Sequence, residues 1–242
     1  MPFQPPARGN GEGADIERLE LVVDRRISVA DQVHAALREA IIDVRLAPGA
    51  PISENSICRQ FAVSRTPVRA AIQRLSEEGL VDVYPHLGSF VSPIRLEGLR
   101  DNQFVRRSLE AALLREVAPR WTGAMSRDMR AVIDEQERLL ATDDPKGFLN
   151  ADEAFHRLFA VFAGREGVWP AILAAKLPLT RFHRYSAKPD RLAHVVVEHL
   201  AVVDALDRGD AAAAEHALAT HLDMIFVMFE ALPEEERRHL SL

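Results

Sequence analysis

The sequence is poor in several features that define large classes of proteins. Cys58 is its single cysteine, so it can form no internal disulfide and has no Cys-x-x-Cys metal or redox site. Its apolar runs fall far short of the about 20 residues that span a membrane, and its first residues do not resemble a secretory signal. These shortages predict a protein of the reducing cytoplasm without membrane contact.

Lysine and net positive charge are also scarce. Lysine occurs three times, and the other 27 basic residues are arginine. Because 36 residues are acidic, the net charge is -6 and the pI is about 5.9. This balance excludes a protein that binds nucleic acid through a globally basic surface, so any contact with DNA must be local.

What remains is an ordinary globular composition. Of 242 residues, 48% are hydrophobic and 27% are charged, which is enough to bury a core in one large or two modest domains. Disorder across the whole chain is therefore excluded. Residues 1–27 are broken by proline, glycine and aspartate, so we expect a flexible leader there.

Residues 28–94 have the pattern of a small domain that begins with helices. Val33, Leu37 and Ile41 recur at helical spacing, and the Leu-Ala-Pro-Gly run at 46–49 ends that helix. This stripe predicts one helix with a buried apolar face.

The rest of this domain predicts two more helices and a hairpin. Ser53 and Ser64 are candidate N-caps of a second and a third helix. Two β-like runs, 80–84 and 89–92, are joined by a turn at 85–88. This order is typical of a winged helix-turn-helix with a small β-hairpin as the wing.

The sequence pattern predicts helices throughout residues 96 to 231. Proline and glycine divide it into segments with short links, which we expect to pack as antiparallel neighbours in an all-α bundle. The segments lie near residues 96–119, 124–142, 145–163, 167–186, 190–208 and 210–231. We therefore predict a mainly α protein with an N-terminal domain at 28–94, an all-helical domain at 95–231 and a tail at 232–242.

The third helix combines an apolar face with an arginine face. Arg65, Arg69 and Gln73 lie at positions i, i+4 and i+8, and residues 55–76 contain four arginines and no acidic residue. The arginine fork can bind guanine in the major groove or clamp a phosphate. In a helix-turn-helix this is the helix that reads DNA; the alternative is a solvated arginine face on an ordinary helix.

The residues around these arginines suit the DNA backbone. Ser64 and Thr66 offer hydroxyls at a helix N-terminus, where backbone amides also favour phosphate. His86, at the expected tip of the wing, is placed to reach an adjacent groove or the backbone. These positions predict a local DNA-binding face on an acidic protein.

Several short segments at fixed spacing carry a family resemblance. They are Leu-Ala-Pro-Gly at 46–49, Ile-Ser-Glu at 52–54, Val-Ser-Arg-Thr-Pro-Val-Arg at 63–69, Leu-Ser-Glu-Glu-Gly-Leu-Val at 75–81, and the run 85–91. Together they resemble the GntR family of bacterial transcription regulators. The resemblance implies that Arg65 and Arg69 touch bases, that Ser64 and Thr66 touch phosphates, and that Gly88 lets the wing backbone approach DNA.

Three positions depart from the family pattern. Asn55 and Leu87 stand where many relatives carry arginine, which bears on the operator sequence. Ala62 replaces the usual glycine of the turn. An alanine in a left-handed turn position costs on the order of 1 kcal/mol.

Histidine is concentrated in the second half, where seven of the nine lie beyond residue 150. Asp152 and His156 are four residues apart and project from one helix face, while His199 and His221 fall on two later helices. One carboxylate and three imidazoles suit a divalent transition metal such as zinc, nickel or manganese. The alternatives are rim or core roles for each histidine, and competing ligands among His183, His194 and His216.

A second resemblance covers residues from about 96 to 229. The matching segments are Val105-Arg106-x-x-Leu109-Glu110, Asp152-x-x-Phe155-His156, Glu198-His199, Ala205-Leu206, Gly209-Asp210 and His221-Leu222. They are similar to the all-helical FCD ligand domain of the FadR subfamily. The likeness implies that Asp152, His156, His199 and His221 hold a metal in a central cavity, with a small organic acid bound beside it.

Three further residues are candidates for binding that acid. Arg106 stands four residues before Glu110, so it can form an ion pair within its helix or offer its fork to an effector carboxylate. The resemblance favours the second role. Arg181 and His183 are expected to line the same cavity.

Together the two resemblances predict a metabolite-responsive transcription regulator, a repressor rather than an enzyme. A homodimer would place two third helices in successive major grooves of an inverted-repeat operator, and the acid would change the packing of the helical domains. The alternative is a helical-bundle metalloenzyme that activates water at the Asp/His group. Against it, the His-Glu-x-x-His, Gly-x-Ser-x-Gly and P-loop motifs are absent from the sequence.

Overall fold

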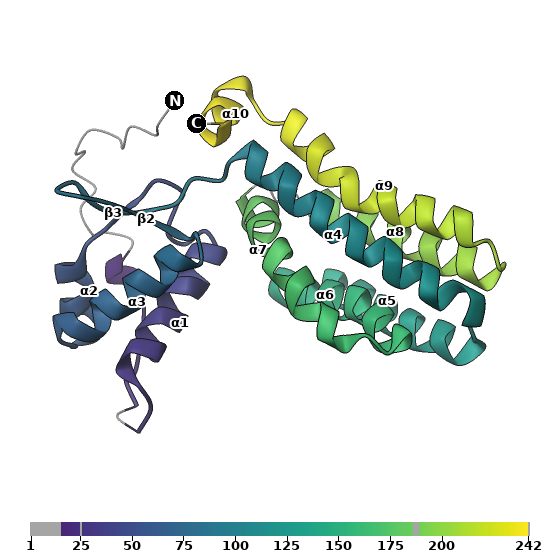
Figure 1. The fold of residues 1–242 in the computed structure, drawn as a ribbon, viewed down its shortest axis with the longest axis horizontal. Coiled ribbons are helices and arrows are strands. Elements are labelled where there is room, and N and C mark those ends of the chain that lie inside the picture. Colours follow the sequence, from purple (N-terminus) through teal and green to yellow (C-terminus); the bar gives the residue numbers. More distant parts are fainter. Residues whose placement is uncertain (1–15, 25, 186–188, 242) are drawn as a thin grey trace. The chain divides into compact units, whose positions relative to one another are not determined.

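Figure 1 shows a computed structural model of the chain, which describes residues 16–24, 26–185 and 189–241. The chain divides into two compact units. The first runs to Leu96 and also includes Thr180–Tyr185 and the last helix, whereas the second comprises Glu97–Leu179 and the stretch from 189 to Pro233. Within the described ranges, no helix has the length and apolar character needed to cross a bilayer.

The first unit is a winged helix-turn-helix, as the sequence predicts. Its strands form an antiparallel sheet in the order β1-β3-β2. Its elements are η1 (Ile16–Arg18), α1 (Val29–Ile42), β1 (Pro51–Ile52), α2 (Glu54–Phe61), α3 (Arg65–Glu77), β2 (Val81–Tyr84) and β3 (Gly88–Val91). The sequence does not predict β1, which pairs with β3 through only two residues.

Apolar stripes hold the three helices of this unit together. Helix α1 packs against α3, and the apolar stripes of both helices are buried: Val33, Leu37 and Ile41 on α1, and Val68, Ile72 and Leu75 on α3. Each such side chain contributes about 1.5–3 kcal/mol by leaving water. Because this face of α3 is inside, its arginine face is outside.

The turn between α2 and α3 positions the start of α3. Ser53 caps α2, where its hydroxyl accepts a hydrogen bond from the Ser56 amide at 3.2 Å. Ala62 ends α2 in the left-handed region, with φ 52°, as its place in the turn predicts. Ser64 is the N-cap of α3 but makes no side-chain cap hydrogen bond, so its hydroxyl remains available to another partner.

Part of the predicted leader is folded. Ile16 and Leu19 are buried, and the Gln60 side-chain amide donates to the Leu19 carbonyl at 2.8 Å. Element η1 thus packs against α2. The sequence pattern could not predict this contact, because so short an element shows no hydrophobic period. Residues 1–15 and 25 of the predicted leader lie outside the described residues.

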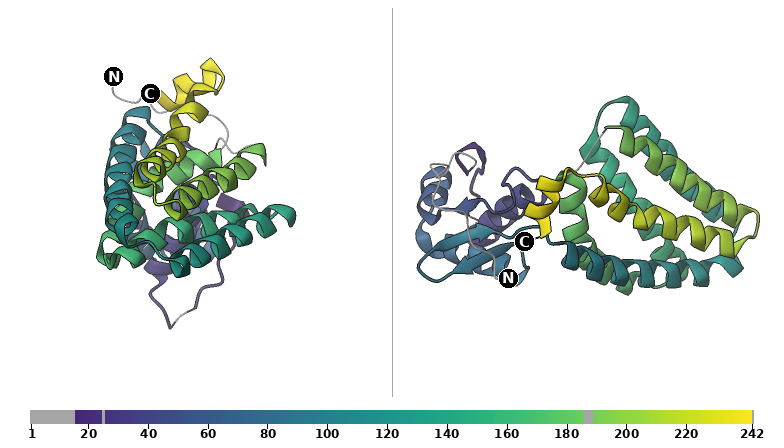
Figure 2. Two further views of the ribbon diagram at one scale, coloured as in Figure 1. Left: turned by 90° about the vertical axis from the view of Figure 1, so that its right-hand side faces the viewer. Right: turned by 90° about the horizontal axis from the view of Figure 1, so that it is seen from above.

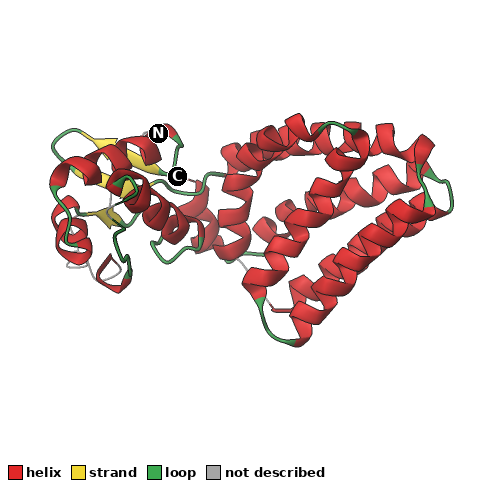
Figure 3. Cartoon of the chain, turned by 90° about the horizontal axis from the view of Figure 1, so that it is seen from below, coloured by secondary structure: helices red, strands yellow, loops and turns green. Residues whose placement is uncertain are grey.

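The second unit consists of helices, as predicted, and Figure 3 colours it red without strands among the described residues. Its elements are α4 (Leu96–Val117), η2 (Ala118–Arg120), α5 (Gly123–Ala141), α6 (Pro145–Ala163), η3 (Glu166–Val168), α7 (Trp169–Tyr185, which ends in the first unit), α8 (Pro189–Asp207) and α9 (Ala211–Glu230). Pairs α5–α6, α8–α9 and α5–α8 pack along one another (Figure 2). The predicted tail differs, because it forms α10 (Glu234–Ser241) with Leu240 buried.

Helix α6 contributes three large aromatic side chains to the core of the second unit. Phe148, Phe155 and Phe159 on this helix are fully buried. The apolar residues that join them in one cluster come from every long helix of the unit. Asp144 caps α6 by accepting from the Gly147 amide at 2.8 Å, so both the start of α6 and its inward face are fixed.

Candidate metal centre and DNA-reading face

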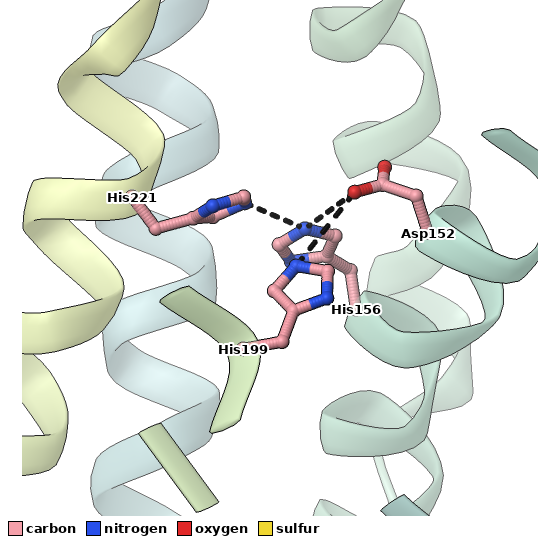
Figure 4. Close-up of side chains that lie close together, drawn as sticks. All are labelled: Asp152, His156, His199 and His221. Carbon is pink, nitrogen blue, oxygen red and sulfur yellow. Dashed lines mark hydrogen bonds and ion pairs between the residues drawn. The ribbon is translucent and has the colours of Figure 1, made fainter. Parts of the chain in front are cut away.

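Four side chains from three helices converge inside the second unit. Asp152 and His156 come from α6, His199 from α8 and His221 from α9, and all four point toward one another (Figure 4). One ligand atom from each lies within 4.8 Å of all the others. Asp152 Oδ1 is 3.7 Å from Nε2 of both His156 and His199, and the Nε2 atoms of His156 and His221 are 3.3 Å apart.

A second layer of side chains orients the three imidazoles. Each Nδ1 lies within hydrogen-bonding distance of a side-chain oxygen, and the partners are Glu110 for His156 (2.6 Å), Gln136 for His199 (2.9 Å) and Glu198 for His221 (2.7 Å). Carboxylate and amide oxygens accept hydrogen bonds, so each Nδ1 carries the proton. Each Nε2 therefore turns its lone pair toward the centre, as in metal-binding histidines.

These atoms fit a divalent cation better than they fit one another. Two Nε2 lone pairs that face each other cannot form a hydrogen bond, and the buried Nε2 of His199 has no hydrogen-bond partner. Metal–ligand bonds of about 2.0–2.2 Å place neighbouring ligand atoms roughly 3–3.5 Å apart, close to the observed spacing. The donor set suits zinc, nickel or manganese.

The surroundings also favour the protonation states that bind metal. Burial and the neighbouring His221 lower the pKa of His199 well below its usual range, and burial lowers that of His221. Burial opposes ionisation of Asp152, but the Lys176 ammonium outweighs it and holds the pKa of this carboxyl well below its usual range. Neutral imidazoles and an ionised carboxylate are the ligating forms.

Arg106 forms the ion pair that the sequence allows and keeps one nitrogen without a partner. Its Nε donates to Glu110 Oε1 at 2.7 Å, so the ion pair within α4 is formed, and both side chains are buried. Its Nη2 is also buried and has no hydrogen-bond partner. One guanidinium nitrogen therefore remains available to a ligand.

Sequence reasoning missed two neighbours of this cluster. Gln136 is a single polar residue in a helix, and no motif distinguishes it. Lys176 carries the only charge in the apolar stretch 169–179, a signal that can be recognised in retrospect. Its Nζ lies 2.9 Å from Asp152 Oδ2, so it contacts a carboxylate of the cluster directly.

Two of the competing histidines lie on the surface of the second unit. The side chains of His194 and His216 are exposed. Arg181 and His183 fall in the part of α7 that belongs to the first unit, where Arg181 Nη2 donates to the Ser92 carbonyl at 2.8 Å and burial lowers its pKa to about 10. The expected role of Arg181 and His183 in lining the effector site stays a prediction.

In the first unit, the predicted DNA-reading residues share an exposed surface. Ser64, Arg65, Thr66 and Arg69 at the start of α3 are all exposed. Arg69 Nε donates to Glu54 Oε2 at 2.9 Å, and the side chain remains 66% exposed. This bond engages one guanidinium nitrogen, so the two terminal nitrogens remain free to form a fork.

The wing ends in a tight, exposed turn. His86 and Gly88 both have positive φ, 64° and 115°, and both are exposed. The Leu87 amide donates to the Tyr84 carbonyl at 3.2 Å and closes the turn. A φ of 115° is comfortable for glycine alone, so Gly88 allows a wing tip without a side chain.

Comparison with known proteins identifies both units. Residues 29–91 match the family of bacterial regulatory proteins called the gntR family, and residues 103–224 match the FCD domain. An HTH-type transcriptional regulator in an unstable DNA locus of Streptomyces ambofaciens is 35% identical over 195 residues, which cover 80% of this chain and 82% of the relative. The chain belongs to the GntR family. Its FCD domain is consistent with the FadR subfamily.

Two other members agree with this assignment. The HTH-type transcriptional repressor RspR of Escherichia coli strain K12 is 30% identical, with 81% of this chain and 87% of RspR covered. A crystal structure of a GntR regulator from Rhodococcus sp. RHA1 superposes with a TM-score of 0.69 at 29% identity, covering 86% of this chain and all of the other.

The family assignment decides the function class. GntR regulators bind DNA, and FCD domains bind small-molecule effectors. The GntR protein described here is thus a transcription regulator and not an enzyme, which excludes the metalloenzyme alternative.

Proposed function

We propose that this regulator is a metabolite-responsive repressor that binds an inverted-repeat operator as a homodimer. A small organic acid, bound in the FCD domain at a divalent metal ion, relieves the repression. The name of the relative RspR supports the repressor role. A dimer suits an inverted repeat because each copy presents one reading helix to one half-site.

The DNA contacts follow from the exposed start of α3. Arg65 and Arg69 reach guanine edges in the major groove with their terminal nitrogens. The free hydroxyl of Ser64 and that of Thr66 bind phosphates beside the helix N-terminus. The wing adds His86 and the bare backbone at Gly88 as further contacts to the DNA.

The sensing site uses the converging cluster on α6, α8 and α9. Asp152, His156, His199 and His221 hold the metal ion through one carboxylate oxygen and three Nε2 atoms. When bound, the ion supplies a positive centre that attracts carboxylate oxygens. Arg106, oriented by Glu110, offers its unpartnered Nη2 to the same acid.

One observation carries the metal assignment. Each of the three imidazoles has its Nδ1 satisfied by a side-chain oxygen, so three Nε2 lone pairs converge on Asp152 Oδ1. A buried cluster of acceptors with no donor among them is costly without a cation.

A matched pair of variants tests this assignment. His199→Ala removes a ligand, whereas His194→Ala removes an exposed histidine of the same helix. After both variants are loaded with zinc and dialysed, elemental analysis should find one metal per chain in His194→Ala. It should find less in His199→Ala, because the loss of a ligand weakens the zinc affinity at least tenfold. Full stoichiometry in His199→Ala with unchanged affinity would refute the ligand set.

The effector role has its own test. A thermal-shift screen of small carboxylates, with and without chelator, should find acids that raise Tm only when metal is bound. The same acids should release the protein from its operator in an anisotropy titration. Acids that act equally well in the presence of chelator would contradict a metal-assisted site.

A further inference from the structure

Every carboxylate around the histidine cluster has a cation of its own. Glu110 pairs with Arg106 at 2.7 Å, and Asp152 pairs with Lys176 at 2.9 Å. Glu198, which accepts from His221, is also held by both terminal nitrogens of Arg191, at 2.6 and 2.7 Å. The protein charges of this region therefore cancel pair by pair.

The Lys176 pair is the unusual member, because it involves a metal ligand itself. Lys176 is 8% exposed, and lysine is seldom buried to this degree without a specific partner. Its ammonium holds Asp152 Oδ2, while Oδ1 of the same carboxylate faces the imidazoles. Lys176 thus leaves Asp152 a single oxygen for the metal and offsets its negative charge.

The charge count has a consequence for any ligand. Three neutral imidazoles and three neutral ion pairs contribute no net charge, so a divalent cation in the cluster would keep both of its positive charges. An uncompensated double charge in a buried place is strongly unfavourable. Among the described residues that contact the cluster, each carboxylate already has a cationic partner, so the compensation must come from the ligand.

We infer that the sensing site takes a dianion, a ligand such as a dicarboxylate, and that Lys176 sets this preference. This inference rests on the proposed function, because it assumes a metal in the Asp/His cluster. It adds the charge class of the effector and a positioning residue that acts through Asp152. A monoanion would leave one positive charge without a partner.

The experiment compares acids of matched length on the zinc-loaded full-length protein. Isothermal titration calorimetry measures the affinities of malonate, succinate and glutarate against those of propionate, butyrate and valerate. We expect at least one dicarboxylate to bind ten times more tightly than its matched monoacid. The inference is wrong if none of the three dicarboxylates shows this advantage in the zinc-loaded protein.

Two variants then assign the preference to Lys176. Lys176→Met removes the charge but keeps much of the side-chain length, and Lys176→Gln is a second neutral variant in case the first does not fold. Either should reduce the dicarboxylate advantage at least fivefold, because Asp152 then offsets one charge of the metal, and either should hold zinc more tightly than the wild type. A preference and a zinc affinity that are both unchanged in the folded neutral variant would overturn the role of Lys176.

The result can be separated from a failure of the proposed function. If the wild-type protein binds no divalent metal, the metal site itself is wrong. If it binds metal but treats matched dianions and monoanions alike, the metal site stands and only the charge preference fails.

Discussion

Arg69 illustrates how a single side chain can be both bound and available. Its Nε is held by Glu54, and the rest of its guanidinium is exposed. An arginine held by one nitrogen loses less rotamer freedom when it binds a base, and so gives a more favourable contact. No ion pair of Arg65 is found in the described part of the chain, so we expect this side chain to bind DNA without such orientation.

Substitution of Arg69 is therefore expected to weaken binding to the operator. Arg69→Ala should cost about 1–3 kcal/mol of specific binding, roughly a tenfold to hundredfold change, because it removes a base contact. Fluorescence anisotropy with operator and with random DNA measures both affinities. The control is Arg127→Ala, an exposed arginine of α5, and an equal small effect in both variants would contradict the assignment.

At the scale of elements, the α2–α3 turn stores strain at one residue. Ala62 ends α2 with φ 52° and ψ 42°, a conformation in which a Cβ is crowded by the backbone. Glycine has no such conflict, although it loses more freedom on folding. The net balance favours glycine where φ is positive.

Ala62→Gly should accordingly stabilise the protein by about 0.5–1 kcal/mol. The same exchange at Ala70, an exposed position inside α3, should destabilise it by about 1 kcal/mol, because helical glycine is unfavourable. Urea unfolding monitored by circular dichroism gives both values. Loss of stability in both variants would show that the turn is not strained.

Periodicity predicts the long helices, because each buries a stripe that recurs along its own sequence. The predicted segments 124–142 and 145–163 match α5 and α6 to within a residue. By contrast, β1 depends on its pairing with β3, in which Ile52 lies opposite Ser89. Likewise, η1 depends on the burial of Ile16 and the nearby Leu19. Such elements depend on distant partners and leave no local pattern.

The candidate metal site could also be predicted only in part from the sequence. The spacing of Asp152 and His156 shows that they share a helix face, but His199 and His221 could not be chosen over the competing histidines without the resemblance. Two structural features distinguish His199 and His221: they lie close to Asp152, and each has an oxygen partner for its Nδ1. His194 and His216, by contrast, are exposed. Lys176 was missed because its partner lies on another helix.

For the molecule as a whole, the charge is distributed to suit its two tasks. The net charge is -6, so binding to DNA depends on the local arginines of the first unit and is sensitive to salt. In the second unit, ion pairs surround the imidazoles and cancel one another's charge, so the charge of a bound cation would have to be balanced by its ligand. A coupling of about 1–3 kcal/mol between effector and operator would be enough for a regulatory switch.

The central claim is that three Nε2 atoms and one carboxylate oxygen bind a divalent metal ion. X-ray absorption spectroscopy of the zinc-loaded full-length protein measures that coordination directly. We expect nitrogen and oxygen ligands at about 2.0–2.2 Å, with the outer-shell scattering of three imidazoles falling to two in His199→Ala. A spectrum with oxygen ligands alone and no imidazole scattering would contradict the claim.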